Sequence, residues 1–178
     1  MPVSGRRPTR TGSFAGPREI SLVVNGASIR RVVEPARHLA DLLREDVGLR
    51  ATHLGCEHGS CGTCSVLVDG QAVRACLVLA VQVDGHEVET LEGLHASGEI
   101  AALQDAFERL DALQCGFCTS GMLVSAASLL RRERAVHHDR VRRALSGNLC
   151  RCTGYVGIVE AVVEVAASRA APGRPGAR

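Results

Sequence analysis

The stretch CEHGSCGTC, residues 56–64, decides how the fold of this sequence is interpreted. It contains three of the eight cysteines of the 178-residue chain. A fourth follows at Cys76, and the others lie beyond a long cysteine-free segment, at Cys115, Cys118, Cys150 and Cys152. The cysteines therefore form two quartets with none left over, and the question is what each quartet holds.

The composition predicts a folded chain with either one core or two small domains. Hydrophobic residues make up 46% of the chain and charged residues 22%. The net charge of +2 is nearly balanced, which argues against a nucleic-acid-binding protein. Arginines between Arg131 and Arg143 are interleaved with Glu133 and Asp139. We interpret them as a solvated helical face, with a docking face for a protein partner as the alternative.

The ends of the chain bear on its location. Residues 1–17 and 170–178 are rich in small residues, proline and arginine, and we expect them to be flexible tails. Arg6 and Arg7 hint at an export signal, but no apolar stretch follows them. The longest apolar run, residues 75–81, is too short to span a bilayer. We therefore expect a cytoplasmic protein without a membrane span.

The spacing of the first quartet indicates an iron–sulfur loop. Cytoplasmic thiols stay reduced, so eight cysteines are not expected to form a disulfide framework. The pattern C-x4-C-x2-C with a further cysteine downstream is that of a plant-type [2Fe–2S] loop. Such a loop turns thiolates inward and offers backbone N–H groups to the sulfurs. The close approach and unusual dihedrals that this needs are available at Gly55, Gly59 and Gly62.

The segments around this loop predict a small mixed sheet. Two hairpins are indicated by strand-like runs on either side of an Asn-Gly and an Asp-Gly pair, which favour two-residue turns. The runs are residues 19–24 and 27–33, then residues 65–68 and 71–75. A helix over residues 35–46, ended by Gly48, and a strand over residues 87–91 complete the pattern. We therefore expect a β-grasp ferredoxin domain over residues 18–93.

The second hairpin also places the fourth cysteine of the first quartet. A two-residue turn at Asp69-Gly70 pairs Cys64 with Ala75, which brings Cys76 beside Cys64. Strict alternation would point Cys76 to the wrong face of the sheet. We therefore predict a bulge or a broken ladder at this end of the hairpin.

The rest of the chain predicts a four-helix bundle over residues 94–169. The first helix is expected to begin after Ser97 as its N-cap, with its apolar face including Ile100 and Leu110. The other three are expected over residues 120–134, 139–146 and 156–168. The fold class is therefore α+β, a ferredoxin domain followed by a helical domain.

The second quartet precedes two of these helices. Cys115 and Cys118 come before the second helix, and Cys150 and Cys152 come before the fourth. Helix N-termini carry unpaired N–H groups and the positive end of the dipole, which favour an anionic cluster. The sequence therefore predicts that two helix starts converge on four thiolates.

Each quartet has alternatives that the residues leave open. Cys115 and Cys118 have the spacing of a thioredoxin-like redox pair, although no βαβ pattern surrounds them. Two zinc sites would also use paired cysteines, but the x4-x2 loop and the Cys-x-Cys pair fit zinc poorly. His53, His58 and His86 could be Rieske-type ligands, yet four cysteines already suffice at the first site. We interpret these histidines as surface or loop residues.

Three motifs together resemble the signatures of a known family. They are GCEHGSCGTC at residues 55–64, QCGFCTSGM at residues 114–122 and GNLCRCTGY at residues 147–155. They resemble the iron–sulfur small subunit, or N-terminal domain, of the xanthine dehydrogenase and aldehyde oxidoreductase family of molybdenum hydroxylases. The resemblance covers about residues 18–167.

The resemblance implies two [2Fe–2S] clusters on this chain. The first would be held in the ferredoxin domain by Cys56, Cys61, Cys64 and Cys76. The second would be held in a helical domain particular to the family by Cys115, Cys118, Cys150 and Cys152. One departure is Ser120, where the family usually has proline; proline at the first helical position favours helix initiation, so the helix start rather than the cluster is affected.

The resemblance also implies partners and a role. A separate chain of this length is similar to the small subunit of a bacterial three-subunit enzyme with a large molybdopterin-binding subunit and a medium FAD-binding subunit, expected as a dimer of heterotrimers. Gln114 and Cys152 would approach the pterin, and the first cluster would face FAD. Electrons would pass one at a time from molybdenum through both clusters to FAD. No catalytic residue is expected on this chain.

Two other functions are compatible with eight cysteines. A stand-alone ferredoxin shuttle with two clusters would need a strongly charged docking face, whereas this chain is nearly neutral. A zinc-binding interaction module is the third hypothesis. If the chain is a subunit, residues of the large subunit select the substrate, which in such enzymes is carbon monoxide, an aldehyde, an N-heterocycle or an aromatic acyl-CoA ester.

Overall fold

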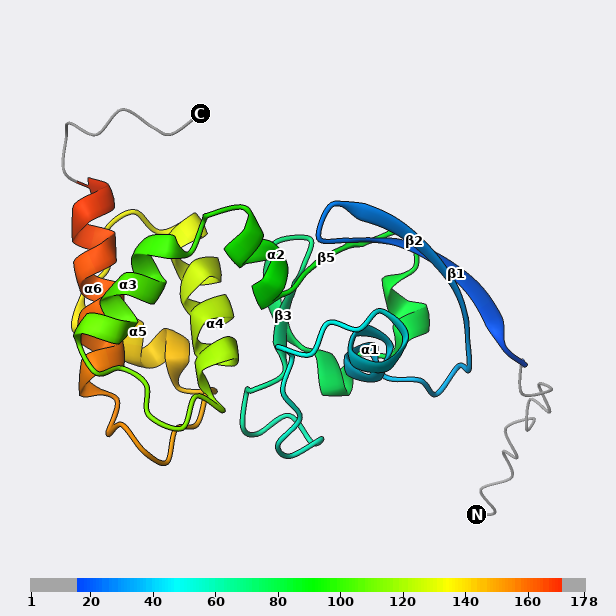
Figure 1. Ribbon diagram of the computed structural model, residues 1–178, viewed down its shortest axis with the longest axis horizontal. Helices are drawn as coiled ribbons and strands as arrows, with labels where there is room; N and C mark the ends of the chain where they lie inside the picture. The colour runs from blue at the N-terminus through cyan, green and yellow to red at the C-terminus, as the bar shows by residue number, and fades with distance from the viewer. Residues whose placement is uncertain (1–15, 171–178) are drawn as a thin grey trace, which may run out of the picture.

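The computed structural model describes residues 16–170 and has the expected α+β architecture. Figure 1 shows a curved sheet on one side of the molecule and a group of helices on the other. The tails expected at the two ends lie outside the described residues, apart from residues 16, 17 and 170. The elements in chain order are β1 (Arg18–Val24), β2 (Ala27–Val33), α1 (Leu39–Asp41), η1 (Leu42–Asp46), β3 (Ser65–Val68), β4 (Gln71–Arg74), η2 (Ala75–Leu77), η3 (Ala80–Val83), β5 (Glu87–Glu89), α2 (Leu91–Ala96), α3 (Ala101–Arg109), α4 (Thr119–Arg132), α5 (His138–Leu145) and α6 (Val156–Ala170).

The sheet is mixed and has the strand order β2-β1-β5-β3-β4. The strand β1 pairs antiparallel with β2 and parallel with β5, and β3 pairs antiparallel with β4 and with β5. Both predicted two-residue turns are present. Asn25 and Gly26 have φ values of 50° and 80°, and Asp69 and Gly70 have φ values of 48° and 76°. Two consecutive positive φ values are typical of the type I′ turn, whose twist matches that of the strands.

The ladder between β3 and β4 breaks where the cysteine pattern required it. The N–H of Ala75 donates to the carbonyl of Cys64 at 3.2 Å, and the chain then turns into the 3₁₀ segment η2. Cys76 therefore lies on a 3₁₀ turn instead of a strand, and its side chain reaches Cys64. The expectation of a broken ladder at this point is confirmed.

The helix expected over residues 35–46 begins only at Leu39. His38 forms a β-bridge with Leu79, and the N–H of Leu39 donates to the carbonyl of Val78 at 2.7 Å. These tertiary hydrogen bonds hold His38 in an extended conformation, after a turn at residues 35 and 36, so the helix cannot begin earlier. The helix then widens into the π-helical turn η1 and ends before Gly48, whose φ of +84° favours glycine.

The junction between sheet and helices differs from the sequence expectation. The last strand, β5, ends at Glu89, and Leu91 begins the helix α2 instead of extending that strand. Ser97 was expected to cap the start of the next helix, but it follows the end of α2, where its hydroxyl donates to the carbonyl of Leu94 at 3.0 Å. The next helix, α3, begins at Ala101. A single serine in the sequence was not enough to distinguish the end of α2 from the start of α3.

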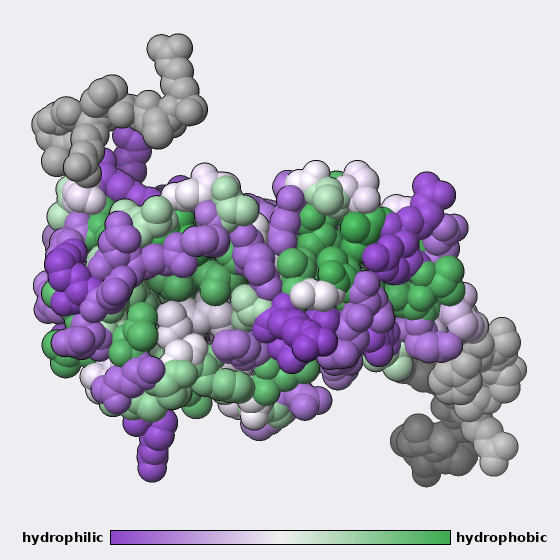
Figure 2. All heavy atoms as spheres, in the orientation of Figure 1, coloured by the Kyte–Doolittle hydropathy of each residue, from purple (hydrophilic) through white to green (hydrophobic). Residues whose placement is uncertain are grey.

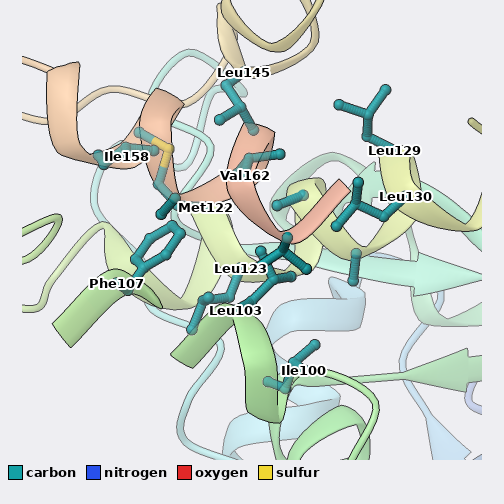
Figure 3. Close-up of a cluster of buried hydrophobic side chains, with 14 of the residues drawn as sticks. Ile100, Leu103, Phe107, Met122, Leu123, Leu129, Leu130, Leu145, Ile158 and Val162 are labelled. Atoms are coloured by element: carbon teal, nitrogen blue, oxygen red, sulfur yellow. The ribbon is translucent and has the colours of Figure 1, made fainter. Parts of the chain in front are cut away.

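Two hydrophobic cores lie on opposite sides of β3. Val66 of β3 belongs to the core between the sheet and α1, and the adjacent Leu67 belongs to the core of the helices. Figure 3 shows side chains of the helical core, among them Phe107, Met122 and Ile158, pointing toward one another from α3, α4 and α6. The helix α4 packs against β3 and β4, so it connects the helices to the sheet.

The face of the molecule shown in Figure 2 has no single apolar band among the residues coloured there. On the face shown in Figure 2, hydrophobic residues form several separate patches among hydrophilic ones. No helix between residues 16 and 170 is both long enough and apolar enough to cross a membrane.

Candidate metal centres

The first quartet is built mainly from the loop between η1 and β3. Left-handed backbone at Glu57, Gly59 and Gly62, with φ values of 54°, 83° and 76°, folds this loop back on itself. The N–H of Cys61 consequently points to the sulfur of Cys56 at 3.4 Å. The loop thus offers backbone donors to sulfur, as the glycine pattern predicted.

The thiols of the first quartet differ in acidity. The backbone N–H groups of Cys61 and then of His58 stabilise the thiolate of Cys56 and lower its pKa to about 6. Burial, with a smaller contribution from the neighbouring thiol of Cys76, raises the pKa of Cys64 to about 11. The first site therefore combines a half-buried thiol that ionises readily, Cys56, with a buried thiol that holds its proton more strongly, Cys64.

The second quartet joins two loops that are distant in sequence. Cys118 is the N-cap residue of α4, while Cys150 and Cys152 lie in the loop before α6. The sulfurs of Cys115 and Cys152 are 3.6 Å apart. Cys118 and Cys150 form the other contact of this site. The predicted convergence at the start of α4 is present, whereas α6 begins a few residues beyond the cysteines.

The thiols of the second quartet also differ in acidity: one sulfur accepts hydrogen bonds and another is buried. Burial opposes ionisation of Cys150, but the hydroxyl and the N–H of Thr153, at 3.1 Å and 3.5 Å from its sulfur, lower its pKa to about 7. Burial raises the pKa of Cys118 to about 12, helped by the neighbouring Cys150. The sulfur of Cys115 raises the pKa of the exposed Cys152.

The cysteines meet in pairs and not around one point. Among residues 16–170, no three Cys, His, Asp or Glu side chains converge closely enough to hold one metal ion. A [2Fe–2S] cluster has two metal atoms and four thiolate ligands, so it needs two pairs. The 3.6 Å between Cys115 and Cys152 is close to the edge of about 3.8 Å of a tetrahedron with metal–sulfur bonds of about 2.3 Å. It is far longer than a disulfide bond, which measures about 2.05 Å.

The pairing therefore fits a binuclear cluster better than zinc, which requires four ligands around one ion. A further donor is available beside the second site. The hydroxyl of Thr119, directly after Cys118, is buried and has no hydrogen-bond partner among the described residues. A sulfur atom that accepts a hydrogen bond from this hydroxyl would satisfy the Thr119 side chain.

The two sites are in direct contact. The N–H of Leu149 donates to the carbonyl of Cys61 at 2.8 Å, which places the residue before Cys150 against the first cysteine loop. The ring of Phe117 lies so close to Gly55 that a Cβ there would be 3.1 Å from it. A cavity of about 280 Å³ is lined by residues of both loops, including Cys61 and Cys118.

Gln114 lies at the outer edge of the second site. Its side-chain amide donates to the carbonyl of Cys152 at 3.2 Å. Cys115 and Cys152 are exposed, whereas Cys118 is buried. The structure therefore brings Gln114 and Cys152 together on the outward side of this quartet.

Several residues at these sites were missed from the sequence. Thr63 and Thr153 have hydroxyls within 3.2 Å and 3.1 Å of a cysteine sulfur, and their nearness in sequence to the cysteines was an available signal. His53, interpreted as a surface or loop residue, stacks on Phe117 with ring centroids 4.9 Å apart. Asn148 lies buried between the two loops. Only tertiary contacts reveal the last two.

Comparisons with known proteins agree with this geometry. Residues 22–94 match the family described as "2Fe-2S iron-sulfur cluster binding domain", and residues 90–163 match "[2Fe-2S] binding domain". The chain is 51% identical over 146 residues to the 6-hydroxypseudooxynicotine dehydrogenase complex subunit beta of Paenarthrobacter nicotinovorans, covering 82% of this chain and 91% of the relative.

Two further relatives connect the chain to named oxidoreductases. It is 42% identical over 147 residues to the xanthine dehydrogenase iron-sulfur-binding subunit of Escherichia coli O157:H7, covering 82% of this chain and 92% of the relative. The crystal structure of quinoline 2-oxidoreductase from Pseudomonas putida 86 superimposes with a TM-score of 0.82 at 50% identity, over 87% of this chain and 97% of that one. The chain therefore belongs to the iron–sulfur small subunits of the xanthine dehydrogenase and aldehyde oxidoreductase family and binds two [2Fe–2S] clusters.

Proposed function

We propose that this chain carries electrons, one at a time, from a molybdopterin centre on a large subunit to FAD on a medium subunit of a molybdenum hydroxylase. The observation that carries the proposal is the contact between the two cysteine sites. The 2.8 Å hydrogen bond from the N–H of Leu149 to the carbonyl of Cys61 joins the loops of both quartets. Two adjacent one-electron sites form a series, as such a relay requires.

The ligand assignment is part of the proposal. The first cluster is held by Cys56, Cys61, Cys64 and Cys76, and the second by Cys115, Cys118, Cys150 and Cys152. Each bound [2Fe–2S] cluster accepts and releases one electron at a time. The hydroxyls of Thr63 and Thr153 and the N–H groups directed at sulfur stabilise negative charge, so they help to set the potential at each site.

The exposure of the second site supports the direction of transfer. Cys115 and Cys152 open to the surface, and Gln114 is hydrogen-bonded beside them. We assign this edge to the pterin, with Gln114 and Cys152 as the approaching groups. The edge of the first site with Cys56, which does not line the cavity shared with the second site, is half-buried and faces FAD in this arrangement.

Exposed apolar side chains support docking near the second site. Phe117 and Leu149, which line the cavity between the sites, are 47% and 53% exposed. Large exposed apolar residues indicate interaction surfaces. We assign this surface to the large subunit, in a complex that is a dimer of heterotrimers.

The domain organisation belongs to the same proposal. We divide the chain into a ferredoxin domain over residues 18–93 and a four-helix bundle over residues 94–169, formed by α3, α4, α5 and α6, with α2 at the junction. We place the complex in the cytoplasm, where thiols stay reduced for cluster assembly.

The names of the relatives suggest a class of substrate for the whole complex. Two of them are named for quinoline and xanthine, which are nitrogen heterocycles. We propose that the large subunit paired with this chain oxidises a nitrogen heterocycle. No residue of this chain is assigned to substrate binding.

Purification of the tagged chain from its native host tests the relay. The expected result is a complex that contains molybdenum, FAD and both clusters, whose EPR signals appear when a nitrogen heterocycle is added. A variant with Cys61→Ser should retain molybdenum but no longer reduce the FAD. Purification of the chain alone, with full cluster content, would instead support a stand-alone ferredoxin shuttle.

A further inference from the structure

Asn148 is a buried polar residue between the two cysteine loops. Its side chain is 2% exposed, and both ends of its amide are hydrogen-bonded. The NH₂ group donates to the carbonyl of Gly62 at 3.1 Å, while the oxygen accepts from the hydroxyl of Ser125 at 3.1 Å and from Arg74 at 3.3 Å. A buried amide with all these partners is held in one orientation.

These partners belong to both candidate centres. Gly62 directly follows Cys61 in the first loop, and Asn148 is two residues before Cys150 in the second. The side chain of Asn148 therefore bonds from the loop of the second site to the backbone of the first loop. The N–H of the next residue, Leu149, makes the backbone bond to Cys61 at 2.8 Å.

Glycines let the two loops approach to backbone contact. A Cβ on Gly62 would be 2.4 Å from the carbonyl oxygen of Gly147, and a Cβ on Gly121 would be 2.2 Å from the carbonyl oxygen of Gly62. Real Cβ atoms do not occupy such distances. Steric contact therefore sets the closest approach of the loops, and the amide of Asn148 holds them there.

Arg74 braces the same contact from β4. Its guanidinium donates to the hydroxyl of Ser65 at 2.5 Å and to the carbonyl of Gly147 at 2.7 Å, besides its bond to Asn148. All its hydrogen-bond partners among residues 16–170 are neutral. Arg74 thus links the hairpin that leads to Cys76 with the loop that leads to Cys150.

We infer that Asn148 is a positioning residue for electron transfer between the two clusters, with Arg74 as its brace. The inference rests on the proposed series of two clusters on this chain and does not depend on the identity of the partner subunits. Asn148 acts through the loops: its amide fixes the separation and relative orientation of the two ligand sets. Electron transfer between two centres slows steeply as their separation grows, so a small displacement of the loops is measurable.

The test uses the chain loaded with both clusters and the variant Asn148→Leu, which keeps the branched shape of the side chain but removes the amide. In the reduced protein, the magnetic interaction between the clusters should split their EPR signals less than in the wild type. Electron exchange between the clusters after flash reduction should be measurably slower than in the wild type. Ser125→Ala is the matched control, because it removes one partner of Asn148 but keeps the bond to Gly62.

A well-loaded Asn148→Leu protein with unchanged splitting and unchanged exchange rate would overturn the inference. If that variant does not load both clusters, the same two measurements on Asn148→Asp decide. The aspartate keeps acceptors for Arg74 and Ser125 but loses the donor to Gly62, so weaker splitting supports the inference and wild-type splitting contradicts it. Because no partner subunit is present in these experiments, failure of the proposed complex would leave their result unaffected.

Discussion

The two cysteine quartets differ in how they are assembled. In the first, three cysteines come from one continuous loop of left-handed turns, and Cys76 is added by the 3₁₀ segment after a hairpin. In the second, Cys115 and Cys118 meet Cys150 and Cys152 only because α4, α5 and α6 pack together. The first site is therefore determined mostly by local backbone geometry, and the second by the helical core.

The quartets also differ in exposure, which bears on their roles. Two cysteines of the first quartet are buried and two are half-buried, while the second quartet exposes Cys115 and Cys152. A site at the surface can approach a cofactor on another chain, but it depends on its scaffold to keep its ligands in place. If the two sites are independent, as this contrast indicates, a substitution at one site should leave the other intact.

The largest expected effect is the loss of one cluster without the other. Under the proposed ligand assignment, Cys150→Ala should remove about half of the iron, because the second cluster would lose one of its four ligands. The first cluster should remain, since all its ligands lie elsewhere, and Cys64→Ala should give the converse result. Iron analysis and EPR of the reduced protein measure this. Loss of both clusters in either variant would mean that the sites form cooperatively.

Opening a cavity in the helical core should affect the second site selectively. Phe107 is 1% exposed, and Phe107→Ala should lower the free energy of unfolding by about 3–5 kcal/mol. The second cluster should then be lost at lower denaturant concentration than the first. Leu39→Ala, in the core beside the sheet, is the matched variant and should reverse the order. Denaturant titration followed by EPR distinguishes the clusters, and simultaneous loss in both variants would contradict the contrast.

Two glycines with the same backbone conformation separate the cost of strain from the cost of contact. Gly62 and Gly70 both have φ of +76°, but a Cβ on Gly70 meets nothing within 4 Å. Gly70→Ala should therefore cost about 1–2 kcal/mol for the left-handed conformation alone. Gly62→Ala should cost more, because the loops must also move apart. Equal unfolding free energies for the two variants would show that the loop contact contributes little.

The smallest expected effect concerns the ion pairs between sheet and helices. Arg131 of α4 binds Glu89 of β5 and Glu99, at distances of 2.6 Å for each pair. The hydrogen bond from Arg131 lowers the pKa of Glu89. Arg131→Met should therefore cost about 1 kcal/mol or less at neutral pH, because the pair is partly exposed.

The pH dependence of that difference follows from the direction of the shift. A lowered pKa in the folded state stabilises the protein above the ordinary glutamate value of about 4.3 and ceases to do so as pH falls through the folded value. The difference in unfolding free energy between wild type and Arg131→Met, measured with urea, should thus be constant near neutral pH and shrink below about pH 4.3. A gap that does not change with pH would mean that Arg131 contributes packing only.

Much of the fold could be predicted from local signals. The Asn25-Gly26 and Asp69-Gly70 turns, and the helices α4, α5 and α6, are where the sequence indicated, because turn conformation and helical periodicity depend on neighbouring residues. The start of α1 was misplaced, since His38 bonds to Leu79, which is distant in sequence. Ser97 was assigned to the wrong helix end, because serine usually precedes a helix, whereas here Ser97 follows the end of α2 and α3 begins only at Ala101.

The two groups of cysteines, the turns of the first loop and the family of the chain all follow from the amino-acid sequence alone. The spacing of cysteines and glycines is enough to predict these features, because the first loop closes through backbone dihedral angles that glycine can adopt. Only the tertiary structure decided that the sites touch, that Asn148 and Phe117 lie between them, and that Cys115 and Cys152 face outward. These features depend on contacts between residues far apart in the chain, which α4 brings together by packing against β3.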